Sequence, residues 1–364
     1  MQFPCAAFAD MEYGGDNDSP KFKMGRIIFT DNGYGYEKEG LEKSEIADED
    51  LVDTDDGGSA YAQKATASLS AKYDPRSKNT LTTIKNQFQT GTCWAFAALS
   101  CTESNLIQKG LENQNVQFSV PSLVLSTYAN GGFDESIWDC GGTWMDSSLA
   151  MAAHRGLCYD EYEPFVSDGT EATIVSEEKK GVCEYQLNYA STITGGRNAI
   201  KNKIKELGGV MVSYYADGLY MTFDNKSYYD PETTKYSGIN HAVSVVGWDD
   251  NYSKSNFLAG YQPKKNGAWL VKGSWGVSNG TDGYYWISYE EAEMTDWVAF
   301  DLTESCDNNY HYPANKDNSI FYVSNENKMS GADVFTAKKD ELLDKVGFMY
   351  LGSVSYTHLR AHET

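Results

Sequence analysis

"KNQFQTGTCWAFAALS", residues 85–100, is the most informative stretch of this chain. After Cys93 the apolar residues recur at helical spacing, which predicts a buried helix that begins at about this cysteine. The unpaired N–H groups and the dipole of a helix N-terminus favour a thiolate. The position therefore predicts a lowered pKa for Cys93 and a nucleophilic sulfur. A small buried hydrophobic residue, or one half of a disulfide, is the alternative that the segment leaves open.

A base for this sulfur is offered by "SGINHAVSVVGWDD", residues 237–250, where His241 precedes a β-branched run that predicts a strand. A lone histidine at such a place is more often a hydrogen-bonded structural residue. The spacing favours the base, because His241 follows Cys93 by about 150 residues, as the catalytic histidine follows the cysteine in papain-type enzymes. The two residues therefore form a candidate nucleophile and base.

The composition indicates a large globular chain with an acidic surface. The 364 residues are 41% hydrophobic, and 52 acidic against 30 basic residues give a net charge of -22 at pH 7. This excess excludes nucleic acid and anionic membranes as expected partners. No run of roughly 20 apolar residues predicts membrane insertion. The 7 cysteines have neither the spacing of a zinc site nor the density of a disulfide framework, so no metal site is predicted.

Two longer stretches resemble the signatures of one enzyme family. "TTIKNQFQTGTCWAF", residues 82–96, and "NGAWLVKGSWGVSNGTDGYYWISYEE", residues 266–291, resemble the nucleophile segment and the last signature of papain-like cysteine peptidases. The resemblance runs from residue 71 to about residue 300. It implies an α+β, papain-like two-lobed fold, in which a helical lobe and a β-barrel lobe meet at a cleft. It also implies an endopeptidase in which Cys93 attacks the scissile carbonyl and His241 transfers protons.

The resemblance also implies roles for residues around this pair. Gln87 matches the glutamine that, together with the Cys93 N–H, donates hydrogen bonds to the oxyanion, and Trp275 matches the tryptophan that shields the pair from water. Four residues are predicted to bind the substrate: Gly141, Gly142, Trp144 and Asn240. A glycine pair lets the backbone approach an extended peptide, although Gly-Gly more often marks a simple turn.

Two departures from the family pattern put its activity in question. Gly273 stands where the family has the asparagine that orients the histidine, and Asn266 lies too early in the sequence to replace it. Without a third group the base is held less firmly. The alternative function is therefore a catalytically weakened or inactive papain-fold binding protein for peptide or glycan. Thr90 stands where the family often has a cysteine, which leaves Cys140 without its usual disulfide partner.

The sequence divides the chain into several segments. They are an acidic N-terminal extension at 1–67, which is a linker or a propeptide remnant; the papain-like domain at 68–302; the start of a β-sandwich-like, lectin-like domain at 303–353; and a tail at 354–364. The tail equals the translation of a sequencing adapter, so it is interpreted as not native and is expected to make no specific contacts. "DTDDGG", residues 53–58, is no EF-hand loop, because Lys64 stands at the twelfth position.

The resemblance sets the expected partners and location. A protein or peptide is the expected substrate, and a cell-wall glycan is a second partner through the lectin-like domain. Secretion or attachment to a bacterial cell surface is expected, although residues 1–9 form no intact signal peptide. No cofactor is predicted, and calcium in the lectin-like domain has no support in the residues.

Overall fold

The computed structural model describes in full residues 69–127, 138, 141–152, 157–165, 183–231, 239–292 and 294–305, and residue 128 and further strands by their backbone. Cys140 and residues 53–58 lie outside the described residues. The helices are α1 (Cys93–Lys109), α2 (Val120–Tyr128), α3 (Trp144–Ala152) and α4 (Gly196–Leu207), with 3-10 turns at Pro75–Ser77, Gly218–Tyr220 and Lys254–Asn256. The strands are β1 (Pro4–Gly14), β2 (Lys21–Thr30), β3 (Gly33–Tyr36), β4 (Lys72–Tyr73), β5 (Tyr185–Thr192), β6 (Val210–Tyr214), β7 (Ser227–Tyr228), β8 (His241–Asp249), β9 (Ala268–Lys272), β10 (Tyr284–Ser288), β11 (Thr295–Glu304), β12 (Lys328–Thr336), β13 (Lys345–Tyr350) and β14 (Ser353–Glu363).

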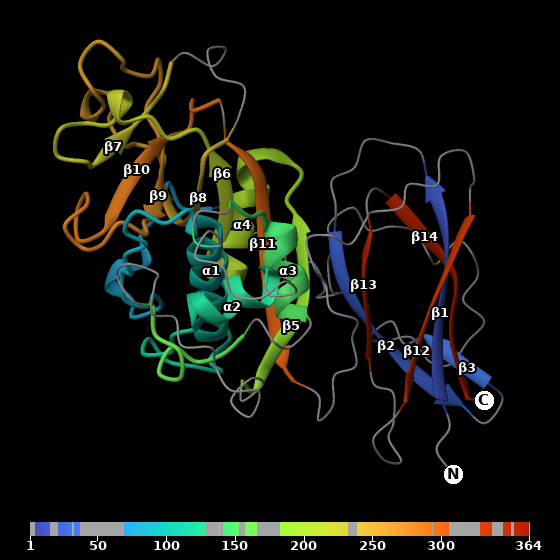
Figure 1. Ribbon diagram of the computed structural model, residues 1–364. Coiled ribbons are helices and arrows are strands. Elements are labelled where there is room, and N and C mark those ends of the chain that lie inside the picture. Colours follow the sequence, from blue (N-terminus) through green and yellow to red (C-terminus); the bar gives the residue numbers. More distant parts are fainter. Residues whose placement is uncertain are drawn as a thin grey trace.

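The predicted buried helix is confirmed, and it begins at Cys93 as α1. Every residue from Trp94 to Leu99 is buried, which is the pattern of a helix inside a domain and not of one on its surface. The helix ends where Gly110 adopts a left-handed conformation (φ 71°) and donates its N–H to the Ile107 carbonyl. In Figure 1, α1 lies beside α2 and α3 and against the sheet.

The second half of the fold is a mixed sheet built around β8. Strand β8 pairs antiparallel with β6 on one side and with β9 on the other, and the order along the sheet is β13-β2-β5-β11-β6-β8-β9-β10-β7. The predicted α+β architecture is confirmed, and the sheet predicted as a β-barrel lobe is open, because no ladder between described strands joins the two ends of this order. The physical reason is that β2 from the N-terminal segment pairs with the edge of β5. This edge is therefore not available for the pairing that would close a barrel.

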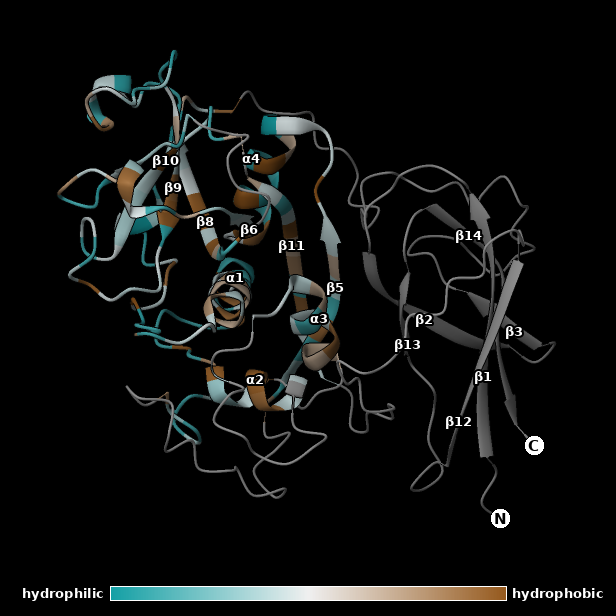
Figure 2. Ribbon diagram, turned by 45° about the horizontal axis from the view of Figure 1, so that its top comes forward, coloured by the Kyte–Doolittle hydropathy of each residue, from teal (hydrophilic) through white to brown (hydrophobic). Residues whose placement is uncertain are grey.

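Two large hydrophobic clusters hold the helices to this sheet. The first joins α1, α2 and α3 to β5 and β11 and includes Trp94, Phe118 and Phe300. The second joins α4 to β6, β8, β9 and β10 and includes Tyr214 and Tyr285. Figure 2 shows the hydrophobic colour concentrated in β9, β11 and α4, whereas the surrounding loops are mostly hydrophilic. Because burial of apolar area drives folding, these clusters fix the position of α1 relative to β8.

Strands from both ends of the chain extend this α+β body. Strand β1 pairs with β12 and with β14, and β2 pairs with β13, β3 and β5. Residues 4–36 therefore contribute strands where the sequence predicted an extension. The expectation that residues 354–364 make no specific contacts is wrong for the backbone, because β14 pairs with β1. An unpaired strand edge accepts an extended segment through main-chain hydrogen bonds whatever its sequence, so the adapter origin of this tail stays a prediction.

Candidate active site

The fold brings the start of α1 against the start of β8, and this places Cys93 beside His241. The backbone N–H groups of Ala242, the residue after the histidine, and of Trp94 lie close enough to the Cys93 sulfur to favour its thiolate form. Residues far apart in the sequence thus meet at the sulfur atom. The described part of the chain contains Cys93 as a free cysteine, which excludes the disulfide alternative there.

Burial dominates the electrostatics of this pair. It raises the pKa of the Cys93 thiol, although the N–H groups of Ala242, Trp94 and Cys93 act in the opposite direction. The predicted lowering of this pKa is therefore wrong for the thiol taken alone. Removing a thiolate from water costs more free energy than the N–H groups at the helix start contribute to its stabilisation. Burial likewise lowers the pKa of His241 to about 3. A neutral thiol beside a neutral imidazole is the resting pair that these directions favour.

The ring of His241 is held by aromatic contacts. The Trp275 indole stacks on it with ring centroids 4.4 Å apart and an interplanar angle of 9°, so the two residues that the sequence predicted as base and shield do lie together. The Tyr214 ring meets the imidazole edge to face at 5.7 Å. The Nε2 atom of His241 is buried and has no hydrogen-bond partner among the described residues. The imidazole is therefore fixed by packing and not by a hydrogen bond at this nitrogen.

Gln87 is positioned by the loop that follows β9. Its side-chain oxygen accepts a hydrogen bond from the Ser274 hydroxyl at 2.6 Å, and its backbone N–H donates to the Ser274 carbonyl at 2.7 Å. One N–H of its amide donates to the Thr90 carbonyl at 2.8 Å. An amide carries two such N–H groups, so one remains for a developing oxyanion. The bridge between Asn86 and Trp275 holds the same two segments together.

The predicted substrate-binding residues have different surroundings. Gly142 lies against the Trp94 ring, where an added Cβ would come within 2.4 Å of the indole, whereas Gly141 has open space around its Cα. Trp144 is only 3% exposed and belongs to the hydrophobic core, so its indole offers almost no surface to a substrate. The exposed Asn240 uses both ends of its amide on the backbone of Ala216, at 2.7 and 3.0 Å. Binding of substrate by these residues stays a prediction.

Gly273 is buried between β9 and the hairpin that leads to β10. Its N–H donates to the Gly283 carbonyl at 3.0 Å. A Cβ at this position would lie 3.0 Å from the same carbonyl oxygen and 3.3 Å from the Tyr285 ring. The sequence drew attention to Gly273 but not to Tyr285 or Tyr214, because an isolated tyrosine inside a strand pattern is an ordinary core residue.

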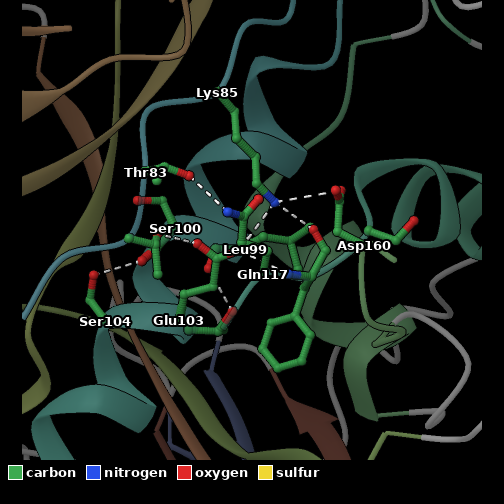
Figure 3. A network of polar contacts seen from close by, with 12 residues as sticks. Thr83, Lys85, Leu99, Ser100, Glu103, Ser104, Gln117 and Asp160 are labelled. Carbon is green, nitrogen blue, oxygen red and sulfur yellow. Dashed lines mark hydrogen bonds and ion pairs between the residues drawn. The ribbon is translucent and has the colours of Figure 1, made fainter. Parts of the chain in front are cut away.

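A buried ionic network lies next to this site, and Figure 3 shows two of its members, Lys85 and Glu103. Glu103 of α1 is 1% exposed, and its carboxylate accepts hydrogen bonds from Thr82 Oγ1 at 2.5 Å, Lys85 Nζ at 3.2 Å and the Phe118 N–H at 2.9 Å. Lys272, adjacent to Gly273, donates to Thr82 Oγ1 at 2.6 Å. Burial lowers the pKa of this lysine to about 8. The network joins α1 to β9 through one threonine hydroxyl.

The described residues hold neither a metal-binding cluster nor a membrane-spanning helix. They contain no group of three or more His, Cys, Asp or Glu side chains placed to hold a metal ion. In the same part of the chain, every helix is too short or too polar to cross a bilayer.

A free cysteine at the start of a buried helix, beside a histidine at the start of a strand in this α+β fold, defines the class of papain-like thiol proteases. The sequence profile described as papain family cysteine protease matches residues 69–301, and the chain belongs to this family. Mouse procathepsin L is 27% identical over 240 residues, which are 64% of this chain and 64% of that protein. Mouse cathepsin K is 28% identical over 212 residues, 58% of this chain and 57% of that protein. The match thus spans less than two thirds of these relatives.

Solved structures of bacterial and animal proteases share the fold. The clostridial cysteine protease Cwp84 after propeptide cleavage matches with a TM-score of 0.59 and 28% identity, over 65% of this chain and 59% of that one. A second structure, of the cysteine protease and lectin-like domains of Cwp84 from Clostridium difficile, matches with a TM-score of 0.59 and 27% identity, over 66% and 54% of the two chains. Digestive procathepsin L2 of Tenebrio molitor, with a TM-score of 0.50 and 22% identity over 65% and 70% of the two chains, shares the fold alone.

Proposed function

We propose that this protein is a cysteine-type endopeptidase that hydrolyses peptide bonds of proteins through Cys93 and His241. The observation that carries the proposal is the approach of the Ala242 backbone, next to His241, to the Cys93 sulfur, because it brings the start of α1 and the start of β8 together across the fold. Membership of the papain family supports the same reaction. A thiol beside a base that can take its proton is the arrangement that this reaction needs.

The reaction starts from the neutral pair. As the substrate carbonyl approaches, the thiol proton passes to His241 and the sulfur attacks the carbonyl carbon, which gives a tetrahedral oxyanion. The free N–H of the Gln87 amide and the backbone N–H of Cys93 donate to this oxygen. The imidazolium then returns the proton to the leaving amine as the C–N bond breaks and a thioester remains. Water, deprotonated by His241, hydrolyses the thioester and restores the thiol.

A binding protein of the same fold is the second candidate. Its support is the buried Nε2 atom of His241, which has no hydrogen-bond partner in the described part of the chain, together with Gly273 at the position predicted for the orienting asparagine. A base without a fixed tautomer is a weaker catalyst. The candidate binder would hold a peptide or a glycan and cleave neither.

We also propose that the protein works at a bacterial cell surface. Support comes from Cwp84, which is described as a surface-layer associated protein with cysteine protease and lectin-like domains. Residues 303–353 resemble the start of a lectin-like domain in sequence, so a cell-wall glycan is the proposed second partner. Secretion of the full-length protein by a bacterial host, followed by fractionation of medium and cell wall, tests this location.

Labelling with a peptidyl epoxide separates the two candidates. The epoxide alkylates a thiol only where a base activates it, so a peptidase is labelled at Cys93 and a binder is not. We expect wild type to be labelled and to cleave an unfolded protein substrate, and Cys93→Ala to do neither while remaining folded. Cys101→Ala is the matched control, because Cys101 is a buried cysteine of the same helix away from the site. Cleavage by pure Cys93→Ala protein would exclude the assigned nucleophile.

A further inference from the structure

The space beside Gly273 is filled by the side chain of Tyr285. An added Cβ at Gly273 would lie 3.3 Å from Cε1 and 3.7 Å from Cδ1 of this ring. Tyr285 is fully buried, so its ring has little room to move away. A longer side chain at position 273 and an aromatic ring at position 285 therefore compete for the same space. The glycine and the tyrosine form one steric unit.

Tyr285 also belongs to a stack of rings that ends on His241. The Trp275 indole lies parallel to the Tyr285 ring, with centroids 6.1 Å apart and an angle of 13°. The same indole stacks on the imidazole at 4.4 Å and 9°. Trp275 is thus in contact with both rings, and the position of Tyr285 limits how far the indole can tilt away from the histidine.

A second tyrosine closes the arrangement. The Tyr214 and Tyr285 hydroxyls are hydrogen-bonded to each other at 2.9 Å, and both side chains are fully buried. Tyr214 lies opposite His241 in the ladder between β6 and β8, and its ring meets the imidazole edge to face. The hydroxyl pair therefore connects the contact on one side of the imidazole to the stack on the other. Each buried hydroxyl satisfies the other, as buried polar groups require.

We propose that Tyr285, coupled to Tyr214 and Trp275, is a positioning residue for His241 and replaces a hydrogen-bonding side chain at position 273. The proposal rests on the proposed function, because the orientation of the imidazole matters only if His241 transfers protons. The rings fix the plane of the imidazole, while its Nε2 atom stays without a partner among the described residues. The arrangement requires glycine at position 273, so Gly273 and Tyr285 must change together.

A double-mutant cycle tests this coupling. Gly273→Asn alone drives its side chain into the Tyr285 ring, and we expect kcat/KM to fall about tenfold or more and Tm to fall. Tyr285→Val alone removes the stack, and we expect kcat to fall about tenfold with KM nearly unchanged, because the loss concerns the orientation of the base and not substrate binding. Combining the two changes gives the asparagine room, so the double variant should exceed the worse single variant by about tenfold in kcat/KM.

Three controls separate positioning from packing. Tyr285→Phe keeps the ring and loses the hydroxyl pair, so it should restore the kcat that Tyr285→Val loses while still lowering Tm. Gly273→Ala adds only a Cβ, and it measures the contact with the Gly283 carbonyl apart from the larger clash of an amide. Tyr284→Val changes the neighbouring tyrosine, whose ring faces Arg76 at 5.7 Å, and kcat should not change.

The outcomes distinguish this proposal from the proposed function. If the double variant is no better than the worse single variant in kcat/KM, or if Gly273→Asn alone raises activity and leaves Tm unchanged, the coupling is wrong. If wild type neither cleaves peptides nor reacts with the epoxide, the proposed function fails. In that case the Tm values of wild type, the two single variants Gly273→Asn and Tyr285→Val, and the double variant still measure the steric coupling. Gly273→Asn should lower Tm more in the wild-type background than in the Tyr285→Val background, and equal losses would overturn the proposal.

Discussion

At the scale of single residues, burial opposes both charges that the reaction creates. A thiolate at Cys93 and an imidazolium at His241 are each unfavourable alone, since burial raises the pKa of the first and lowers the pKa of the second. Transfer of one proton from sulfur to nitrogen forms both charges together, and their mutual attraction offsets part of the cost. The ionic pair is therefore expected to form when the substrate binds and excludes water, and not in the resting protein.

Alkylation of Cys93 by iodoacetamide tests this resting state. The reagent is small and neutral, so its rate follows the thiolate population. We expect the rate to rise with pH through pH 9, because burial holds the pKa of the thiol above its ordinary value of 9.0. A plateau that already begins near pH 5 would show a resting thiolate and imidazolium. Cys93→Ala corrects for reaction at the other cysteines.

Stability at acid pH reports on His241 by itself. The folded protein binds a proton there only near pH 3, whereas the unfolded chain does so near the ordinary value of 6.5. Between these values the unfolded state holds more protons, so stability is fully present above about pH 6.5 and is lost as the pH falls toward 3. We expect Tm to fall more steeply from pH 6.5 to 4.5 in wild type than in His241→Gln. Parallel curves for the two proteins would contradict the buried neutral imidazole.

At the scale of elements, α1 carries the nucleophile at its first residue and a buried carboxylate farther along. Glu103 receives hydrogen bonds from Thr82, Lys85 and the Phe118 backbone. Removing one partner of a buried ionic group leaves the others uncompensated. The network therefore fixes the helix against the segment before it and against β9, which ends at Lys272, next to Gly273. Loss of this network should lower the stability of the fold more than it changes the reaction itself.

Glu103→Ala is expected to lower the free energy of unfolding by about 3–5 kcal/mol, the cost of leaving buried cations without their carboxylate. Glu103→Gln keeps a hydrogen-bonding oxygen and should cost less. Glu206→Ala is the matched control, because this glutamate also pairs with a lysine on a helix but is 48% exposed, where such pairs contribute about 0–1 kcal/mol. Urea denaturation measures all three, and equal losses at positions 103 and 206 would contradict the role of burial.

The parts of the site that the sequence predicts are those with local signals. Cys93 and His241 could be singled out because the residues around each of them predict a helix start and a strand start. The direction of the pKa shift of Cys93 could not be predicted, because burial of the thiol raises its pKa by more than the start of the helix lowers it. Tyr214 and Tyr285 could not either, since their roles arise from contacts between strands far apart in the sequence. The sequence did not predict the open sheet for the same reason, because β2 pairs with β5, a strand that lies far from it in the sequence.

At the scale of the whole molecule, both ends of the chain add to the sheets. Strand β1 lies between β12 and β14, and β2 covers the edge of β5. In Figure 1, β1, β12 and β14 lie on the far side of β5 from α1. The proposed catalytic pair, Cys93 at the start of α1 and His241 at the start of β8, lies where the large sheet has run three strands beyond β5. Changes at the two termini should therefore alter edge pairing and association more than they alter the site.

Two deletions separate the pairing of β2 with β5 in the large sheet from the pairing of β14 with β1 in the small sheet. Deleting residues 1–36 removes β1, β2 and β3, so it leaves the edge of β5 exposed and β12, β13 and β14 without their partners. An exposed edge with unpaired N–H and C=O groups associates with other chains. We expect this variant to form oligomers or aggregates in size-exclusion chromatography with light scattering. Deleting residues 353–364 removes one outer strand of the small sheet, and we expect the protein to stay monodisperse.

The same pair of variants also tests whether the tail is structural. The pairing of β14 with β1 is made of main-chain contacts that any extended segment can offer, and it does not involve the large sheet that carries the site. Loss of the tail should therefore change the free energy of unfolding by less than about 1 kcal/mol, the size of an ordinary destabilising mutation, and should leave epoxide labelling of Cys93 unchanged. A larger loss for the tail than for residues 1–36 would reverse this ranking and make β14 an integral strand.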